Sequence, residues 1–505
     1  MNRKIRAIQW GEIPFFFITT PLAIAITIAY FYPQTHFSAL ALFSTATLPL
    51  LSFLIPLSPF HFLYPIRNAL VPLIALTAVF LLWILSQQTW RKYAVKSGNT
   101  HHLTIVEVKK KSSFAKFNDG EVVFLRSNQF QAGDQITAEG TLRRIRPKRL
   151  SDTSDFDFYT YATRKNIRYS LKPHRVALVG RAPWTSIHLH ALRWRDHLGQ
   201  SLTQGSRYGG WVKAILFGDD REIEGDDLTL FQQTGTLHVL AVSGMHVSVL
   251  FTVVDALLKL LPGFRRWPWI RFLAGNGTLW MYALVSGFTP SIARSAWMFS
   301  LGSLGKLIHR EGIALNHLFA SAFFILLLEP THLFHLGFQL SFIAVGSILL
   351  FEPWFTHLFS WNSWVGKKLG AALGVSTAAQ FGTAPLGFFY FHSFPIWFLP
   401  ANLIAVPLSS FLLLLFLLLL PLHIFLPNSI RLFLLDQPIH TFIRIMSVFE
   451  NIPFASLTGE ISWEQVWIFF LGILLFRNAI IFPSIQQGIM ILLIFLVGIM
   501  WPFYG

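Results

Sequence analysis

The stretch HVLAVSGMHVSVLF, residues 238–251, joins the hydropathy of a membrane segment to polar side chains. It carries His238, Ser243 and His246, and an acidic, turn-rich segment precedes it. Polar groups at membrane depth cost free energy, so they usually face a bundle interior or a water-filled cavity. The stretch therefore predicts a membrane helix with a polar stripe, in which Ser243 and His246 share one face. The alternative is that these side chains only hold neighbouring helices together.

The composition favours a polytopic membrane protein. Of 505 residues, 53% are hydrophobic and only 13% are charged, whereas soluble proteins carry about 25% charged residues. Cysteine is absent, which excludes disulfides, thiol nucleophiles and cysteine-based metal sites.

The apolar runs divide the chain into four predicted parts. Residues 1–88 contain three apolar segments behind the basic flank MNRKIR, which favours a retained N-terminal helix and a cytoplasmic N-terminus. Three crossings place residues 89–183 outside the cytoplasm. Residues 184–207 form an amphipathic linker, and residues 208–505 return to the membrane with seven to nine expected spans.

Residues 89–183 read as a small extracytoplasmic β-barrel, for which an OB-like fold is preferred. Alternating or β-branched segments suggest five short strands, separated by turn signals such as NDG and AGD. The expected strands lie at 101–111, 121–127, 134–145, 166–172 and 175–180.

Basic residues concentrate in the same part of the chain. Between Trp90 and Pro183 there are 19 Lys and Arg but only 8 Asp and Glu. Such an excess implies an anionic partner such as nucleic acid, lipid headgroups or a cell-wall polymer. The plain alternative is that these residues line the membrane surface.

The membrane half contains further polar groups. Pro290 and Gly287 predict a helix break, after which Ser291 is a natural N-cap. Arg294 lies one turn further on, where it could either snorkel to the interface or face inward as a phosphate contact. Prolines near 385 and 407 predict two broken or distorted helices. The candidate functional residues are Asp219, His238, Ser243, His246, Ser291, Arg294, Gln339, Ser341, Gln380 and Asn402.

The sequence gives little support for catalysis or metal binding. It lacks G-x-x-x-x-G-K-[ST], H-E-x-x-H and G-x-S-x-G. His238 and His246 are too far apart for one metal unless the chain is broken between them, and His332 with His335 is read as an interfacial pair. We expect no enzyme activity, metal or cofactor, although a membrane hydrolase using His238 or His246 as base stays open.

Taken together, these motifs resemble the ComEC competence-protein family. The similar blocks are LFGDDREI, GTLHVLAVSGMHVSVL, SGFTPSIARSAWM, EPTHLFHLGFQLSFIAVGSI and AQFGTAPLGFFYF followed by ANLIAVPL, in that order. SDTSDFDFYTYATRKNIRYS is similar to a further block but lacks its N-P-G turn, and Glu329 and Ser295 also depart from the pattern.

The resemblance implies an inner-membrane channel that carries single-stranded DNA into the cytoplasm during natural transformation. No metallo-β-lactamase-like domain, found in many members, follows in this sequence, so a separate nuclease is expected beside a DNA receptor, a cytoplasmic motor and membrane lipids. The alternative is a transporter of another anionic polymer, lipid or glycan intermediate.

For a DNA channel, the barrel would collect the polyanion. Phe114, Phe117, Phe124 and Phe130 interleave with basic residues and could stack on bases, although at least two are expected to fill the barrel. The candidate DNA-binding residues are Lys109, Lys110, Lys111, Lys116, Arg126, Arg143, Arg144 and Arg146.

Overall fold

A computed structural model describes most of the chain from residue 100 to residue 481. The described ranges are 100–109, 112–117, 122–127, 129–145, 169–181, 186–223, 225–240, 244–260, 266–310 and 312–481, with a few isolated positions besides. The apolar segments predicted before residue 88 lie almost entirely outside these ranges. The chain divides into two compact units. The first unit contains Ala191–Ala296 and the chain from Gln339 onward, and the second contains the strands between residues 100 and 181 and Trp297–Phe338.

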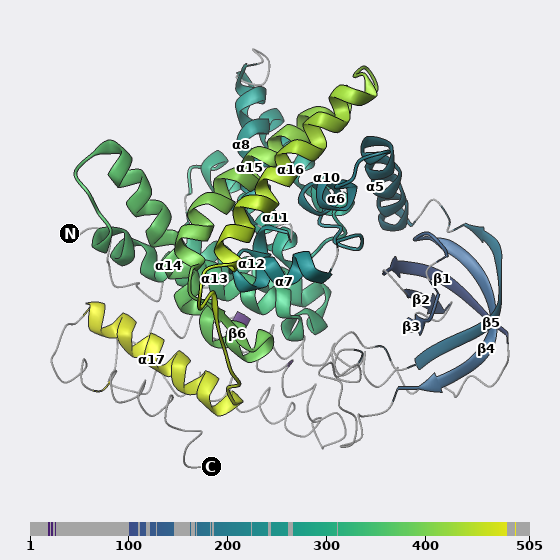
Figure 1. Cartoon of the computed structure of the whole chain (residues 1–505), viewed down its shortest axis with the longest axis horizontal. Coiled ribbons are helices and arrows are strands. Elements are labelled where there is room, and N and C mark those ends of the chain that lie inside the picture. Colours follow the sequence, from purple (N-terminus) through teal and green to yellow (C-terminus); the bar gives the residue numbers. More distant parts are fainter. Residues whose placement is uncertain are drawn as a thin grey trace, which may run out of the picture. The chain divides into compact units, whose positions relative to one another are not determined.

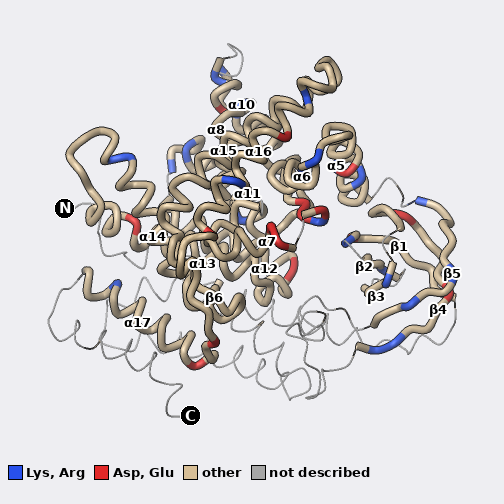
Figure 2. The backbone as a smooth tube through the Cα atoms, in the orientation of Figure 1, with Lys and Arg blue, Asp and Glu red and all other residues tan. Residues whose placement is uncertain are grey.

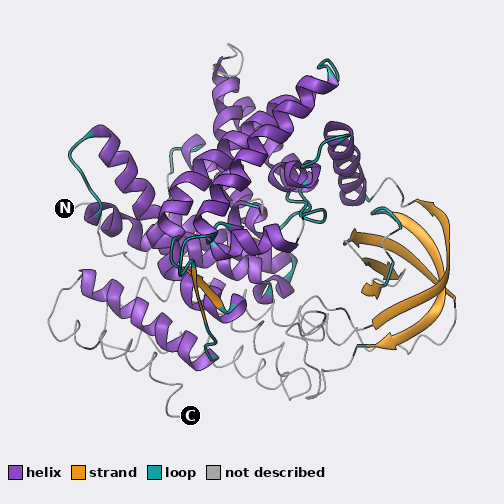
Figure 3. Ribbon diagram, viewed as in Figure 1, coloured by secondary structure: helices purple, strands orange, loops and turns teal. Residues whose placement is uncertain are grey.

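Five strands close into a small barrel (Figures 1 and 3). Around the barrel their order is β1-β2-β3-β5-β4, with β3 and β5 parallel and the other pairs antiparallel. Alternate residues point inward because side chains on a strand alternate between its faces, and the interior includes Leu103, Ile105 and Leu125. The strands are β1 Thr100–Val108, β2 Ser113–Phe117, β3 Val122–Leu125, β4 Asp134–Arg144 and β5 Tyr169–Arg181.

The barrel has five strands, as predicted, but two details differ. The segment SFAKF forms β2, which the sequence reading missed. The two strands expected at 166–172 and 175–180 are one strand, β5, which runs through Pro173. Gly140 allows this continuity, because a β-carbon there would lie 2.8 Å from Cα of Pro173, and the ladder shifts register beside it.

Helices dominate the rest of the described chain (Figure 3). The predicted linker is largely a helix, α5 (Ile187–Thr203). The others are α6 Gly209–Phe217, α7 Gly225–Gln233, α8 Gly244–Leu260, α10 Pro268–Val285, α11 Pro290–Leu307, α12 Ala314–Leu328, α13 Leu336–Leu358, α14 Trp364–Phe391, α15 Phe398–Leu422, α16 Asn428–Glu450 and α17 Trp463–Ile481. Two 3-10 turns, η4 Leu237–Val239 and η5 Pro330–Phe334, and two short strands, β6 Ser393–Pro395 and β7 Ser456–Thr458, complete them.

Four of the described helices are long and apolar enough to cross a membrane: α13, α15, α16 and α17. These helices support a membrane protein. The number is below the seven to nine spans expected, because the remaining described helices are shorter or less apolar.

One of the expected helix breaks is present, and the helices expected to be broken or distorted at prolines are continuous. The break at Gly287 is present, since α10 ends at Val285 and α11 begins at Pro290, and both Gly287 and Phe288 have positive φ. By contrast, α14 continues through Pro385 and α15 through Pro407. Neighbouring helices can compensate for the backbone bonds that proline removes.

The core of the first unit lies between α6, α7, α15 and α16. Phe231 of α7 occupies its middle, 5.0 Å from the ring of Trp211 and 5.3 Å from that of Phe442 between centroids. Burying each large aromatic ring removes much apolar surface from water, so this cluster fixes the short helices α6 and α7 against the long α15–α16 hairpin.

A row of small residues on α14 packs against α13. A β-carbon on Gly374 would lie 2.7 Å from the backbone nitrogen of Thr356, and one on Gly382 would lie 2.5 Å from Cβ of Ser347. Ser347 also donates a 2.6 Å hydrogen bond to the carbonyl of Ala378. This is the close approach that small residues four apart allow between membrane helices.

Candidate functional site

Arg294 lies inside the helix bundle of the first unit. It is 5% exposed, so it does not snorkel to the surface. Its Nε donates a 2.9 Å hydrogen bond to Oγ of Ser341, and its Nη2 donates to Oγ of Ser295 at 3.3 Å. Two of the predicted residues, Arg294 of α11 and Ser341 of α13, are therefore in direct contact across two helices.

Gly244, the first residue of α8, completes this site. A β-carbon at Gly244 would lie 2.6 Å from Nη2 of Arg294 and 2.7 Å from Oγ of Ser295. The backbone of α8 thus approaches the guanidinium as closely as a glycine permits. Gly244 and Ser295 were not among the predicted site residues, although the sequence marked Gly244 as a small residue that lets another helix approach. We call Gly244, Arg294, Ser295 and Ser341 the arginine site.

The two histidines of the opening stretch lie in different elements. The reading of 238–251 as one helix is wrong, because His238 belongs to η4 and α8 begins only at Gly244. His246 is fully buried on α8, whereas His238 is exposed. Ser243, which was predicted to share a face with His246, lies outside the described residues.

The remaining predicted polar residues occupy separate positions. Ser291 is not an N-cap, because α11 begins at Pro290 and the carbonyl of Thr289 accepts the first helical bonds. Gln339 of α13 accepts a 3.4 Å hydrogen bond from the hydroxyl of Tyr390 on α14. Gln380 is half-buried on α14, and Asn402 is buried on α15.

Asp219 takes part in a network of two carboxylates and two guanidinium groups. Arg221 donates from Nε to Oδ1 of Asp219 at 2.6 Å and from Nη2 to Oδ1 of Asp196 at 2.8 Å. Arg195 of α5 binds the same oxygen of Asp196, also at 2.8 Å. The network ties α5 to the α6–α7 loop, and it was not foreseen because its members come from two segments.

The charges of this network determine the ionisation of Asp219. Burial alone would raise the pKa of this carboxyl, but the hydrogen bond and charge of Arg221, with the charge of Arg195, hold the pKa below its usual value. Burial alone would lower the pKa of Arg221, but its hydrogen bonds to Asp219 and Asp196 and their charges raise it. Asp219 therefore stays ionised as a structural anion.

Further acidic residues lie on the backbone between α6 and η4, among them two at the start of α7 (Figure 2). Asp226 and Asp227 lie in the first turn of α7, where a negative charge is favourable. Asp227 accepts a 3.0 Å hydrogen bond from Nε1 of Trp211. Asp219, Glu222 and Asp227 are thus held by partners within the protein.

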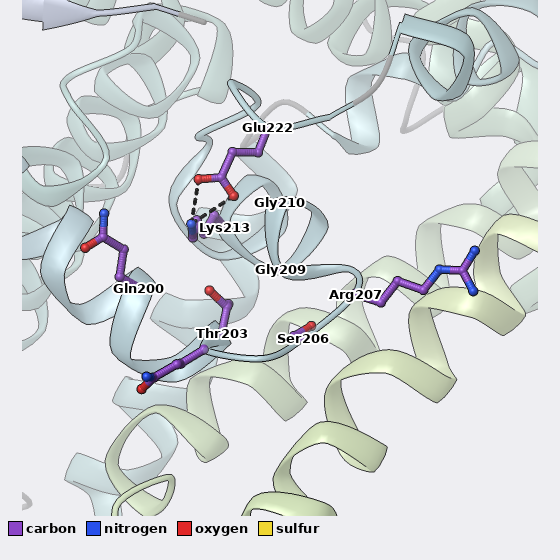
Figure 4. A pocket seen from close by; sticks show the side chains of 9 residues that line it. Gln200, Thr203, Ser206, Arg207, Gly209, Gly210, Lys213 and Glu222 are labelled. Carbon is purple, nitrogen blue, oxygen red and sulfur yellow. Dashed lines mark hydrogen bonds and ion pairs between the residues drawn. The ribbon is translucent and has the colours of Figure 1, made fainter. Parts of the chain in front are cut away.

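A polar pocket of about 350 Å³ lies between α5 and α6 (Figure 4). Its lysine, Lys213, is already paired with both oxygens of Glu222, at 2.7 and 2.9 Å. Arg207 points away from this pair in Figure 4. The pocket therefore offers no converging positive charge, and we assign it no ligand.

The barrel displays basic residues on its outer surface. Arg143 and Lys172 are exposed and lie two ladder positions apart, since Arg143 pairs with Ser170 and Thr141 with Lys172. Arg126, the residue after strand β3, is exposed as well. Of the other predicted residues, Lys116 and Arg144 are exposed, Lys109 is paired with Glu107 at 2.7 Å, and Lys110, Lys111 and Arg146 lie outside the described residues.

None of the four phenylalanines is an exposed stacking surface. Phe117 is buried in the barrel interior and Phe130 packs against it. Phe114 and Phe124, 5.7 Å apart between ring centroids, pack on the outer side with Ala162 and Ile167. Phe117 and Phe130 pack with the interior cluster, as expected for at least two of the rings. The structure does not support base stacking by these phenylalanines, because their packing stabilises the barrel instead.

Within the part of the chain that the structure describes, no three His, Asp or Glu side chains form a group that could hold a metal ion.

The fold and site define a multi-helix membrane protein with a small β-barrel domain and a buried arginine site. The chain belongs to the competence protein family, whose sequence model matches residues 215–485. The matched region includes the whole arginine site.

Curated relatives agree with this assignment. The chain is 33% identical to ComE operon protein 3 of Bacillus subtilis over 202 residues, which are 40% of this chain and 25% of the relative. It is 27% identical to Recombination protein 2 of Haemophilus influenzae, over 42% of this chain and 28% of that protein. The uncharacterized protein YcaI of Escherichia coli is 24% identical, over 48% of this chain and 33% of that protein. The chain thus spans a quarter to a third of these relatives, and no solved structure matches it.

Proposed function

We propose that this protein is an inner-membrane channel that takes part in DNA uptake for natural transformation and passes single-stranded DNA. The observation that carries the proposal is the arginine site: a guanidinium held inside the bundle where three separate motifs of the competence family meet. Guanidinium groups are well suited to phosphate, because their planar donors match its oxygens. The role is transport rather than catalysis.

The distribution of charge supports an orientation in the membrane. Basic residues lie in and beside the α8–α10 and α13–α14 connections, namely Lys259, Arg266, Lys367 and Lys368. Acidic residues lie in and beside the α16–α17 connection, namely Glu450, Glu460 and Glu464. Basic connections favour the cytoplasm. The proposal takes α14 as a crossing beside α15 and α16, although α14 falls short of the apolar character of those two helices. Three crossings then place the basic α13–α14 connection and the acidic α16–α17 connection on opposite sides.

Pairing of β6 with β7 agrees with this orientation. These strands lie in the α14–α15 and α16–α17 connections, which two crossings place on the same side. In this orientation that side is extracytoplasmic. Gly244 starts α8 at the end remote from the basic α8–α10 connection, so the arginine site lies towards the extracytoplasmic entrance.

The barrel suits a role in collecting DNA. We assign it an OB-like fold on its strand order and an extracytoplasmic position after three N-terminal crossings from a cytoplasmic N-terminus. Exposed Arg126, Arg143 and Lys172 would neutralise phosphates and release counterions, so binding would weaken as salt increases. A DNA receptor, a cytoplasmic motor and a separate nuclease belong to the same proposal.

Current recordings on the purified full-length chain in planar bilayers test the channel. An applied potential replaces the motor, and we expect an ionic current that single-stranded oligonucleotides block and that duplexes of equal length block far less. Arg294→Gln should shorten the blockades, whereas Gly277→Ala, where a β-carbon meets nothing within 4 Å, should not.

Other outcomes separate the alternatives. A folded, inserted protein that carries no current would contradict the channel. Blockade by phosphorylated lipid or glycan fragments but not by DNA would favour a transporter of another anion. Cleavage of DNA that His246→Ala abolishes would instead indicate a hydrolase.

A further inference from the structure

One end of the barrel exposes apolar side chains. Leu178 is 58% exposed and Val179 is 65% exposed near the end of β5. The ladder pairs Ile136 with Leu178 and Gln135 with Gly180, so Val179 is the extra residue of a β-bulge. A bulge re-aims side chains and bends its strand. Here it brings two neighbouring aliphatic residues to the surface together.

Basic side chains accompany them. Arg181, the last residue of β5, is exposed and lies opposite Asp134 at the start of β4. The β1–β2 turn lies at the same end, because β1 is antiparallel to β4 and runs on past its pairing with Gln135. That turn begins at Lys109, whose side chain is 41% exposed and whose ammonium is paired with Glu107 at 2.7 Å. An apolar pair flanked by cations matches the boundary between lipid tails and anionic headgroups.

The chain leaves the barrel at this end. Only six positions separate Arg181 from Ile187, the first residue of α5, which limits the separation to about 20 Å. The helix α5 exposes Ile187 by 65% and Trp194 by 58%. Exposed tryptophan on an amphipathic helix is typical of the membrane–water interface. If α5 lies at the interface, the short connection keeps this end of the barrel within about 20 Å of the start of that helix.

We propose that the β5 end of the barrel docks on the anionic lipid surface, with Leu178 and Val179 inserted among the headgroups and Arg181 against lipid phosphate. Docking divides the basic residues into two sets. Arg181 and Lys109 face lipid, while Arg126, Arg143 and Lys172, on the outer side of the strands, stay accessible to a polyanion. The inference does not depend on the proposed channel activity.

The absence of cysteine from the sequence permits a direct test on the full-length chain. Val179→Cys carries an environment-sensitive fluorophore in vesicles that contain anionic phosphatidylglycerol. Thr141→Cys is the matched control, because Thr141 is exposed on the adjacent strand at the far end of the barrel. We expect a blue-shifted emission at position 179 that brominated lipids quench at least twofold, with neither effect at position 141.

Each other result overturns the proposal. Equal, water-like emission at both positions shows that the end is not docked. A blue shift at position 179 without quenching shows contact with protein instead of lipid. Equal quenching at both positions shows unspecific adsorption. Quenching at position 179 that is unchanged in purely zwitterionic vesicles removes the role of the cations, which Arg181→Gln tests independently by the same readout.

Discussion

The guanidinium of Arg294 lies against the backbone of Gly244, so close that a β-carbon on the glycine would be 2.6 Å from Nη2. Two helices from distant motifs thus meet at a single glycine and a single buried charge. The contact has no room for a methyl group, since Oγ of Ser295 also lies 2.7 Å from the same position.

Gly244→Ala should therefore destabilise the protein by about 1–3 kcal/mol through overpacking and weaken transport. The measurement is thermal unfolding of the purified protein in detergent, with bilayer current as the second readout. Gly277→Ala on α10 is the control, because its β-carbon meets nothing within 4 Å. Equal unfolding temperatures for wild type and Gly244→Ala would show that Arg294 can move aside freely.

Asp219→Asn should lower stability at neutral pH and have less effect in acid. The pKa of Asp219 is held below its ordinary value of 3.8, so its ionised form stabilises the fold above that pH. This contribution is lost as the pH falls through the folded-state pKa. We expect a loss of about 1–3 kcal/mol at pH 7 from a weakened charged hydrogen bond.

The check is thermal unfolding of wild type and Asp219→Asn across an acid series, in which the difference should narrow below pH 3.8. Asp220→Asn provides the comparison, because the neighbouring Asp220 is exposed. A pH-independent difference for Asp219→Asn would show that its role is steric rather than electrostatic.

Gly374→Ala should separate α14 from α13. Its β-carbon would lie 2.7 Å from a backbone nitrogen of Thr356, which cannot rotate away, and we expect a loss of about 1–3 kcal/mol. Gly387→Ala lies on the same helix with nothing within 4 Å and should be neutral or stabilise by about 0.5–1 kcal/mol. Thermal unfolding of both variants in detergent measures the difference in stability between them. An equal loss of stability in the two variants would show that the contact between α13 and α14 is not the cause.

Arg143→Gln combined with Lys172→Gln should reduce the salt dependence of DNA binding. Each phosphate contact with a single strand contributes about −0.7 to the slope of log K against log salt, so losing two should make the slope shallower by about 1.4. Anisotropy of a labelled oligonucleotide with the detergent-solubilised chain gives the slope. Arg181→Gln, at the proposed lipid-facing end, should leave this slope unchanged. A shallower slope for Arg181→Gln with an unchanged slope for the double variant would show that DNA binds the β5 end of the barrel instead.

Local patterns allowed much of the barrel to be predicted. Alternation and turn signals identified β1, β3 and β4 because each is set by its own residues. The five-residue strand β2 was missed because SFAKF is too short to show a pattern. β5 continues through Pro173 because Gly140 of the neighbouring strand β4 leaves room for it. The residues of β5 by themselves therefore do not predict that it is one strand.

The same limit applies to the candidate site. Residue type and hydropathy were sufficient to select Arg294 and Ser341, but their contact with Gly244 is a property of tertiary packing. The small residues of α14 did leave a signal, since Gly366, Gly370, Gly374, Ala378 and Gly382 recur every four residues. Of the two outcomes predicted for the helices with Pro385 and Pro407, a break is excluded, because neighbouring helices can support the backbone at a proline.

The ladder between β6 and β7 has a mechanical consequence. Its register joins Ser393 to Thr458 and Pro395 to Ser456, and Gly459 adds a 3.1 Å backbone bond to the carbonyl of His392. Main-chain hydrogen bonds thereby join the segment after α14 to the segment after α16. A movement that separated the end of α14 from the exit of α16 would first have to break these main-chain hydrogen bonds.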